Sequence, residues 1–192
     1  NKITRRRLPV GIQSFKKIRE ERYLYVDKSD IVWDLANDSV AALTMRAEGD
    51  IQSIQAQLYL ALDTCQLPDA MKSLKALIAD VPNSNKKLAS MDMEERYSLI
   101  ISSILNAIGF RTEVEHMLST GRIDILCITP HYTYVIELKL SKNGGVAAAE
   151  KQIKDNQYLE PFKADKTRQV VGLAIELEDL GKGLLEWKRV EE

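Results

Sequence analysis

The sequence of 192 residues is poor in cysteine, in aromatic residues and in net charge. Its two cysteines, Cys65 and Cys127, lie in apolar surroundings without metal-ligand spacing, so reduced core thiols in a cytoplasmic protein are expected. Lys and Arg number 27 against 28 Asp and Glu, which argues against a strongly basic, non-specific nucleic-acid binder. No apolar run is long enough to span a bilayer, and residues 1–7 lack the apolar core of a signal peptide, so no membrane partner is expected.

Residues 38–89 have the pattern of a helical region, because apolar side chains recur at spacings of three and four. Two runs, 51–62 and 70–81, carry stripes of Leu, Ile and Met that are expected to pack in a core as helical hairpins. Asp50 is a candidate cap for the first run, and Pro82 would end the second.

Residues 90–192 alternate between helical and strand patterns in the order αβββαββ. This order predicts an α/β fold with a mixed central sheet flanked by helices. Glycine after the first helix, at Gly109, is typical of a helix end. The expected helices are 93–108 and 146–162, and the expected strands are 111–118, 121–127, 134–140, 169–175 and 183–190.

Four charged side chains interrupt the two apolar strands at 121–127 and 134–140, namely Arg122, Asp124, Glu137 and Lys139. Side chains alternate along a strand, so Glu137 and Lys139 share one face, and a hairpin would bring Asp124 of the preceding strand beside them. Two carboxylates and some waters suit Mg²⁺, and a nearby ammonium can orient a water or offset developing charge. The alternative is a structural ion pair between Glu137 and Lys139, since E-x-K is a common tripeptide.

Asp124 together with Glu137-Leu138-Lys139 resembles the signature of the PD-(D/E)XK nuclease superfamily. More narrowly, they resemble the nuclease domain that often ends bacterial proteins with an AAA-ATPase-like front half. The resemblance covers about residues 90–190 and implies a restriction-endonuclease-like core. Gln157 stands where the family usually has glycine, before Tyr158. The matching motifs are Gly121-Arg-Ile-Asp124, Tyr134-Val-Ile-Glu137-Leu138-Lys139-Leu140 and Gln152-Ile-x-x-x-x-Tyr158.

The resemblance implies a nuclease that depends on Mg²⁺ or Mn²⁺ and acts on nucleic acid, with DNA favoured over RNA. Asp124 and Glu137 would bind the metal together with the carbonyl of Leu138. Lys139 would position the attacking water, and Gln152 would orient Lys139 or the scissile phosphate.

A glutamate on the helix at 93–108 is expected to complete the site. The apolar stripe of that helix places Glu94 on its buried side, where it would support the metal through water. The alternative reading of Glu94 is a first-turn acid favoured by the helix dipole. Glu95, rotated away from the stripe, is the second candidate.

Arg122, Lys151 and Tyr158 are candidates for substrate binding. Arg122 shares a face with the metal-site aspartate, and contact with a phosphate is weighed evenly against pairing with Glu113 or Glu115. Lys151 could follow a nucleic-acid backbone, although a solvated helix face explains it as well. Tyr158 occupies a position that matches the family pattern.

Residues 1–37 resemble the opening of the AAA-ATPase-like domain through the run LPVGIQSFKKIREERYLYVDKSDIVWDL. That domain should continue into a phosphate-binding loop, yet no G-x-x-x-x-G-K-[ST] is found in the sequence. ATP binding is therefore not expected, because the loop amides, lysine and hydroxyl are missing. We predict three parts: a remnant of the ATPase domain at 1–37, the helical region at 38–89 and the nuclease-like domain at 90–192.

A second hypothesis is a catalytically silent nuclease fold that binds nucleic acid or protein. The missing ATPase core, the near-neutral charge and an aromatic content of 6%, sparse for base stacking, favour it. Retention of two acids and a lysine in one place favours the enzyme, because a module without catalysis has no physical reason to keep them. Whether the chain forms a homodimer is left open.

Overall fold

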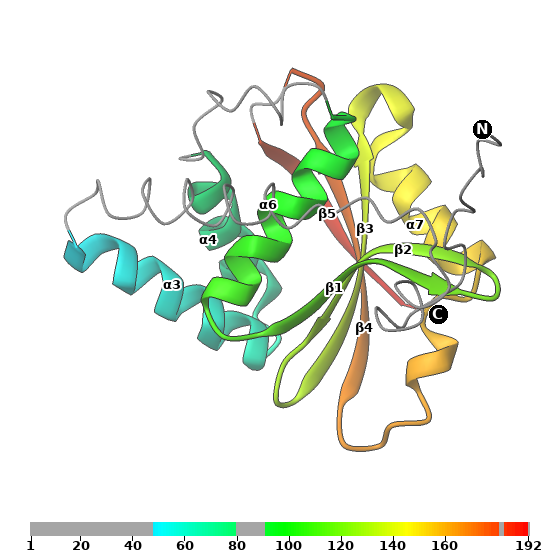
Figure 1. The fold of residues 1–192 in the computed structure, drawn as a ribbon, viewed down its shortest axis with the longest axis horizontal. Coiled ribbons are helices and arrows are strands. Elements are labelled where there is room, and N and C mark those ends of the chain that lie inside the picture. The colour runs from blue at the N-terminus through cyan, green and yellow to red at the C-terminus, as the bar shows by residue number, and fades with distance from the viewer. Residues whose placement is uncertain (1–47, 80–90, 181–182, 192) are drawn as a thin grey trace, which may run out of the picture. The chain divides into compact units, whose positions relative to one another are not determined.

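A five-stranded β-sheet lies at the centre of the structure, with helices on both faces (Figure 1). The computed structural model describes residues 48–79, 91–180 and 183–191, all within the unit formed by residues 31–192. The predicted remnant at 1–37 lies outside the described residues. The helices are α3 (Glu48–Asp63), α4 (Leu67–Ala79), α6 (Met93–Ala107) and α7 (Gly145–Asp155), and the 3₁₀ turns are η1 (Ser141–Asn143) and η2 (Glu160–Phe162). The strands are β1 (Arg111–Leu118), β2 (Gly121–Ile128), β3 (Tyr132–Leu140), β4 (Gln169–Leu177) and β5 (Leu184–Val190).

The strands lie in the sheet in the same order as in the sequence, from β1 to β5. Neighbouring strands are antiparallel except β3 and β4, which are parallel and are joined through α7. A parallel pair needs such a crossover, because its strands start at the same end of the sheet. The observed αβββαββ order of this mixed sheet confirms the restriction-endonuclease-like α/β class.

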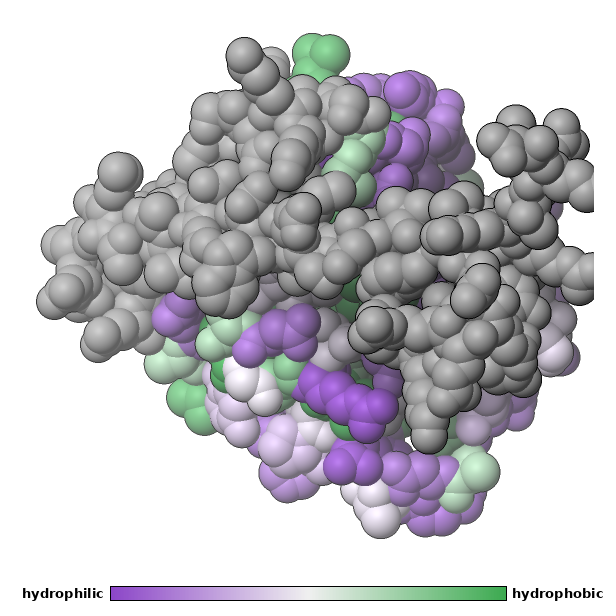
Figure 2. Space-filling view, in the orientation of Figure 1, coloured by the Kyte–Doolittle hydropathy of each residue, from purple (hydrophilic) through white to green (hydrophobic). Residues whose placement is uncertain are grey.

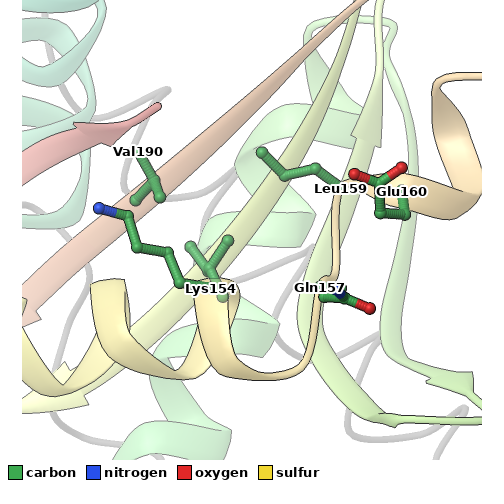
Figure 3. A pocket seen from close by; sticks show the side chains of 6 residues that line it. Lys154, Gln157, Leu159, Glu160 and Val190 are labelled. Carbon is green, nitrogen blue, oxygen red and sulfur yellow. The ribbon is translucent and has the colours of Figure 1, made fainter. Parts of the chain in front are cut away.

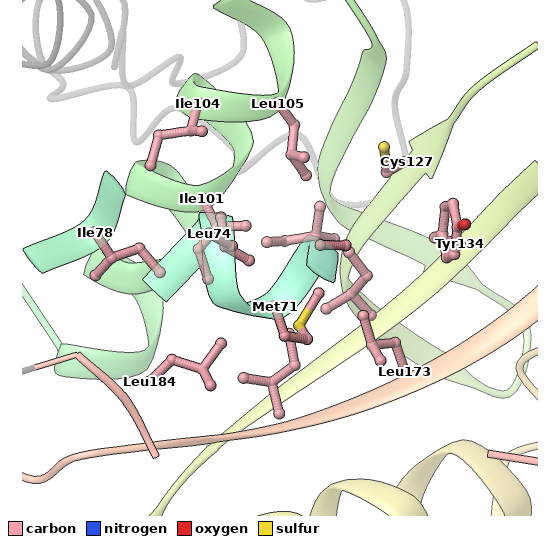
Figure 4. Close-up of a cluster of buried hydrophobic side chains, with 14 of the residues drawn as sticks. Met71, Leu74, Ile78, Ile101, Ile104, Leu105, Cys127, Tyr134, Leu173 and Leu184 are labelled. Atoms are coloured by element: carbon pink, nitrogen blue, oxygen red, sulfur yellow. The ribbon is translucent and has the colours of Figure 1, made fainter. Parts of the chain in front are cut away.

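Helices α3, α4 and α6 cover one face of the sheet with the larger apolar cluster (Figure 4). Met71 and Leu74 of α4 meet Ile101 of α6 there, above the sheet residues Tyr134 and Leu173 (Figure 4). The stripes of Leu and Met in the helical region are therefore core, as predicted.

Cys127 of β2 belongs to this apolar cluster, and burial raises the pKa of its thiol to about 12. Such a thiol stays protonated and unreactive at neutral pH. Neither Cys127 nor Cys65 forms a disulfide.

Helix α7 covers the opposite face with a smaller cluster, in which Ala149 and Ile153 pack near Val135 of β3. Glu150 of α7 also pairs with Lys188 of β5 at 2.6 Å. One helix therefore covers several strands on this face, where charged side chains help to hold it in place.

The end of α7 corrects the helix predicted over 146–162. The helix stops at Asp155, and Gln157 follows with a φ of 52°, in the left-handed region. The amides of Gln157 and Tyr158 donate to the carbonyls of Lys154 and Ile153, both at 3.0 Å, which is the usual pattern of a left-handed helix end. Glycine adopts this conformation without strain, so glutamine at position 157 makes the fold less stable than glycine would.

Two further predictions differ from the structure in detail. Asp50 lies inside α3, which extends back to Glu48, and so it does not cap that helix. Strand β4 runs to Leu177, two residues beyond its predicted end. In contrast, α6 ends as expected, with Gly109 at a φ of 101°.

The surface shown in Figure 2 mixes hydrophilic and hydrophobic residues over the part that is coloured. Large hydrophobic side chains are exposed at Leu60, Met117, Leu180 and Leu185. Within the described ranges, no helix combines the length and the apolar character needed to cross a bilayer.

Candidate active site between two separating strands

Strands β2 and β3 pair along only part of their length. Their last paired residues are Ile125 and Ile136, next to Asp124 and Glu137. Beyond that point β2 stays paired with β1, and β3 stays paired with β4. The two strands therefore separate where the predicted metal-binding carboxylates begin.

Two carboxylates occupy the edge of β3 that β2 leaves. Oδ2 of Asp124 accepts a hydrogen bond from the amide of Leu138 at 2.8 Å. Oε1 of Glu94, from the first turn of α6, accepts one from the amide of Leu140 at 3.0 Å. Backbone donors away from water need partners, so these acids replace the missing strand while remaining at the site.

Glu137 has no exposed surface, and only one of its carboxylate oxygens is paired. Oε1 lies 3.4 Å from Nζ of Lys139, whereas Oε2 is buried without a hydrogen-bond partner. The same ammonium donates to the carbonyl of Leu138 at 3.2 Å and lies 3.6 Å from Oε2 of Glu94. Buried polar atoms are nearly always paired, and Glu137 can share a hydrogen bond with Asp124 when one of the two carboxyls is protonated. Either a proton or a cation therefore fits beside this oxygen.

The electrostatics of the cluster follow from its burial. Loss of solvation, reinforced by the nearby charge of Asp124, raises the pKa of Glu137 to about 8. Burial also raises the pKa of Asp124, although the hydrogen bond from Leu138 opposes it. For Lys139 burial acts to lower the pKa, but the surrounding carboxylates outweigh it and raise the value. Negative charge is therefore in excess, and a bound cation would relieve it.

The donor set fits a hard divalent cation. Asp124 and Glu137 supply carboxylate oxygens, and the carbonyl of Leu138, the residue after Glu137, accepts a hydrogen bond from the ammonium of Lys139. Among the described residues, no group of three or more His, Cys, Asp or Glu side chains is arranged to hold a metal. Mg²⁺ does not require one, because it keeps several waters and needs only one or two protein carboxylates.

Residues 92–183 match the model of the PD-(D/E)XK nuclease superfamily. This part of the chain is a PD-(D/E)XK nuclease-superfamily domain. Residues 9–48 match the model of a predicted AAA-ATPase family, which agrees with the resemblance seen in the sequence. No curated protein and no solved structure gave a significant match.

Within the nuclease-superfamily domain, Gln152 and Tyr158 lie together, and the hydrogen bond of Gln152 is to Tyr158 rather than to Lys139. Nε2 of Gln152 donates to the hydroxyl of Tyr158 at 3.5 Å. Tyr158 is only 1% exposed, and its hydroxyl bonds to the backbone of Arg122. The structure thus places Tyr158 in the core, where its side chain has almost no surface for a substrate.

The other two predicted substrate-binding residues lie on the surface of the domain. Arg122 is exposed and pairs with Glu115 at 3.3 Å, which is the ion-pair alternative left open by the sequence. Glu113 pairs instead with Arg111 and His116, each at 2.7 Å. Lys151 is exposed on α7.

Sequence reasoning missed the polar residues that support the site from the β3–α7 connection. Nδ2 of Asn143 donates to Oε1 of Glu94 at 2.7 Å. Glu176 of β4 accepts from the hydroxyl of Ser141 at 2.6 Å and from the amide of Val146 at 3.1 Å. A Gly-Gly pair such as Gly144–Gly145 is typical of a turn, but nothing in the sequence indicates the partners of these side chains.

A pocket of about 400 Å³ lies at the other end of α7 (Figure 3). It shares no residue with the carboxylate cluster, so the candidate site is defined by its charges rather than by this pocket. The lining residues are Ile153, Lys154, Gln157, Leu159, Glu160 and Val190.

Proposed function

We propose that the nuclease-superfamily domain is a divalent-metal-dependent nuclease that hydrolyses phosphodiester bonds of nucleic acid, with DNA favoured as the substrate. The observation that carries this proposal is the buried, unpartnered Oε2 of Glu137 beside Asp124. The ion pair of Glu137 with Lys139 leaves that oxygen without a donor, and its burial costs free energy unless a proton or a cation is bound beside it.

Each residue of the cluster has a proposed role. Asp124 and Glu137, with the carbonyl of Leu138, bind Mg²⁺ or Mn²⁺. When bound, such a cation polarises a phosphoryl oxygen and lowers the pKa of a coordinated water. Lys139 holds the attacking water by a hydrogen bond from its ammonium and offsets negative charge that develops on the phosphate. Glu94 fixes the ammonium of Lys139 through their 3.6 Å ion pair.

Substrate binding is proposed to use exposed positive charges on β2 and α7. Arg122 can leave its solvent-exposed pair with Glu115, which is weak, to contact a phosphate. Lys151 lies on the exposed side of α7. The half-exposed Gln152 remains a proposed contact for the scissile phosphate, since its recorded hydrogen bond is to Tyr158 rather than to Lys139.

The test is a cleavage assay with single- and double-stranded DNA and RNA in Mg²⁺, in Mn²⁺ and in a chelator. Cleavage should need the metal and should be lost in Asp124→Asn, Glu137→Gln and Lys139→Ala. Matched controls are Glu160→Gln and Lys163→Ala, which break an exposed ion pair of 2.9 Å in η2 and the turn that follows. Both should cleave as the wild type does.

Two outcomes would overturn the proposal. The first is a folded wild-type protein that binds no divalent metal and cleaves no substrate of the panel, which would favour the silent binding module. The second is cleavage that survives in Glu137→Gln at the wild-type rate.

A further inference from the structure

The hydroxyl of Tyr158 forms two hydrogen bonds with the backbone of one residue on β2. It accepts from the amide of Arg122 at 3.0 Å and donates to the carbonyl of the same residue at 2.9 Å. Both groups of Arg122 belong to the part of β2 that no longer pairs with β3. One side chain therefore supplies the donor and the acceptor that a neighbouring strand would supply.

The absence of a side chain at Gly121 leaves space for this hydroxyl. A Cβ atom on Gly121 would lie 2.4 Å from the hydroxyl oxygen of Tyr158, so a larger residue at this position would collide with it. Gln152 approaches the same oxygen from α7 at 3.5 Å. Tyr158 follows the left-handed turn at Gln157, which ends α7 and directs the ring towards β2. A side chain just beyond the end of α7 thus bonds directly to the backbone of β2.

We propose that Tyr158 is a positioning residue, which fixes the separated end of β2 and thereby aims the carboxylate of Asp124 at the metal site. Asp124 lies two residues after Arg122, so both side chains lie on the same side of the strand. Its Oδ2 is held by Leu138, and its direction depends on where β2 runs after it leaves β3. The effect of Tyr158 on cleavage rests on the proposed nuclease function. Its effect on the position of β2 and of Asp124 does not.

Because Tyr158 is buried, removal of its hydroxyl should act through the metal site and not through contact with substrate. Substitution of residues that orient metal ligands costs about 10- to 100-fold in metal affinity or activity. We expect a loss of that size in kcat and in Mg²⁺ affinity, with KM for nucleic acid changed less than about twofold. A raised KM with unchanged kcat and unchanged Mg²⁺ affinity would instead mean direct substrate contact and would overturn the proposal.

Amide hydrogen exchange of the 192-residue chain, followed by NMR, tests the proposal without metal and without cleavage. In metal-free Tyr158→Phe, the amides of Arg122 and Leu138 should exchange roughly tenfold faster, after normalisation to Leu173 in the central strand β4. The matched control is Tyr134→Phe, because the fully buried hydroxyl of Tyr134 also donates to a backbone carbonyl, but on the opposite face. This control should leave both normalised rates unchanged.

Unchanged exchange of Leu138 in a folded Tyr158→Phe protein would overturn the proposal even if the wild type is an active nuclease. Conversely, faster exchange together with an inactive wild type would leave the positioning intact and remove the nuclease function. If Tyr158→Phe fails to fold, hydrogen exchange of the wild-type protein tests the proposal instead. Its Arg122 amide should be protected nearly as well as that of Leu173, and exchange at the rate of an unpaired edge amide would overturn the proposal.

Discussion

The two faces of the sheet bury different kinds of side chain: one buries apolar groups, and the other also buries charged groups. The face under α3, α4 and α6 is covered by the larger cluster, made of Leu, Ile and other apolar side chains. The face under α7 has a smaller cluster and also buries the carboxylate of Glu137, with Lys139 mostly covered beside it. The face under α3, α4 and α6 stabilises the fold by removing apolar surface from water. On the face under α7, the burial of charged groups costs part of the free energy gained from apolar burial. Most of the apolar stabilisation therefore lies on one side of the sheet and the pair of Glu137 with Lys139 on the other, while Glu94 reaches that pair from α6.

The largest effect should come from a cavity on the apolar face. Leu74 of α4 is only 2% exposed within the larger cluster, so Leu74→Ala should lower the free energy of unfolding by about 2–5 kcal/mol. Chemical denaturation measures this, and Leu185→Ala, at a half-exposed site on β5, should change it little. The metal response of the folded variant should stay that of the wild type, and its loss would break the division between the faces.

The pH dependence of the metal-free protein should come from the α7 face. The folded-state pKa of Glu137 is about 8 against an ordinary value of 4.5, so the folded state binds more protons than the unfolded state across this interval. Stability should be highest below pH 4.5 as far as this group is concerned, and should fall as pH rises to 8. The loss is about 1.4 kcal/mol for each pH unit at most. Denaturation at several pH values should show this slope, and Glu137→Gln should flatten it.

A divalent cation should reverse that loss. Metal that binds only the folded state stabilises it by about 2.7 kcal/mol when its concentration is 100 times Kd. The melting temperature should therefore rise with Mg²⁺ or Mn²⁺ in the wild type and in Glu160→Gln, but not in Glu137→Gln. Asp124→Asn should also abolish the rise while leaving the metal-free protein intact, because its amide oxygen can still accept from Leu138. A loss of several kcal/mol in metal-free Asp124→Asn would mean a structural cluster instead.

The smallest effect concerns the end of α7, outside the charged site. Gln157→Gly should stabilise the protein by about 1 kcal/mol, because it removes a side chain from a left-handed position. The control is Asn156→Gly, where φ is −91° and glycine should bring no gain. Thermal melting compares the two, and equal gains would show that the left-handed conformation is not strained.

The fold and the meeting of the charged residues could be predicted from local patterns. Alternation of apolar residues identified β2 and β3 and assigned Glu137 and Lys139 to one face. Helical periodicity likewise placed Glu94 on the inner side of α6, where it reaches the amide of Leu140. Both inferences need only the geometry of a single element, which the sequence specifies directly.

Features that depend on two distant elements could not be predicted in this way. Where β2 separates from β3, Tyr158 bonds to the backbone of Arg122, which lies 36 residues away in the sequence. Residues Ser98 and Ser102 are buried although polar, since α6 contacts both α4 and the sheet. The early end of α7 had a weak local signal, because Gln157 replaces the expected glycine.

The gap between β2 and β3 also bears on self-association. A strand that loses its neighbour presents free backbone amides, to which a strand of another chain can add. At Leu138 and Leu140 those amides are occupied by the carboxylates of Asp124 and Glu94, and the bound acids repel an incoming backbone carbonyl. The acids of the proposed active site therefore disfavour edge-to-edge aggregation, because they block the addition of a strand from another chain. Studies of inactive variants should accordingly use Asp124→Asn, which keeps an acceptor at this edge, in preference to Asp124→Ala.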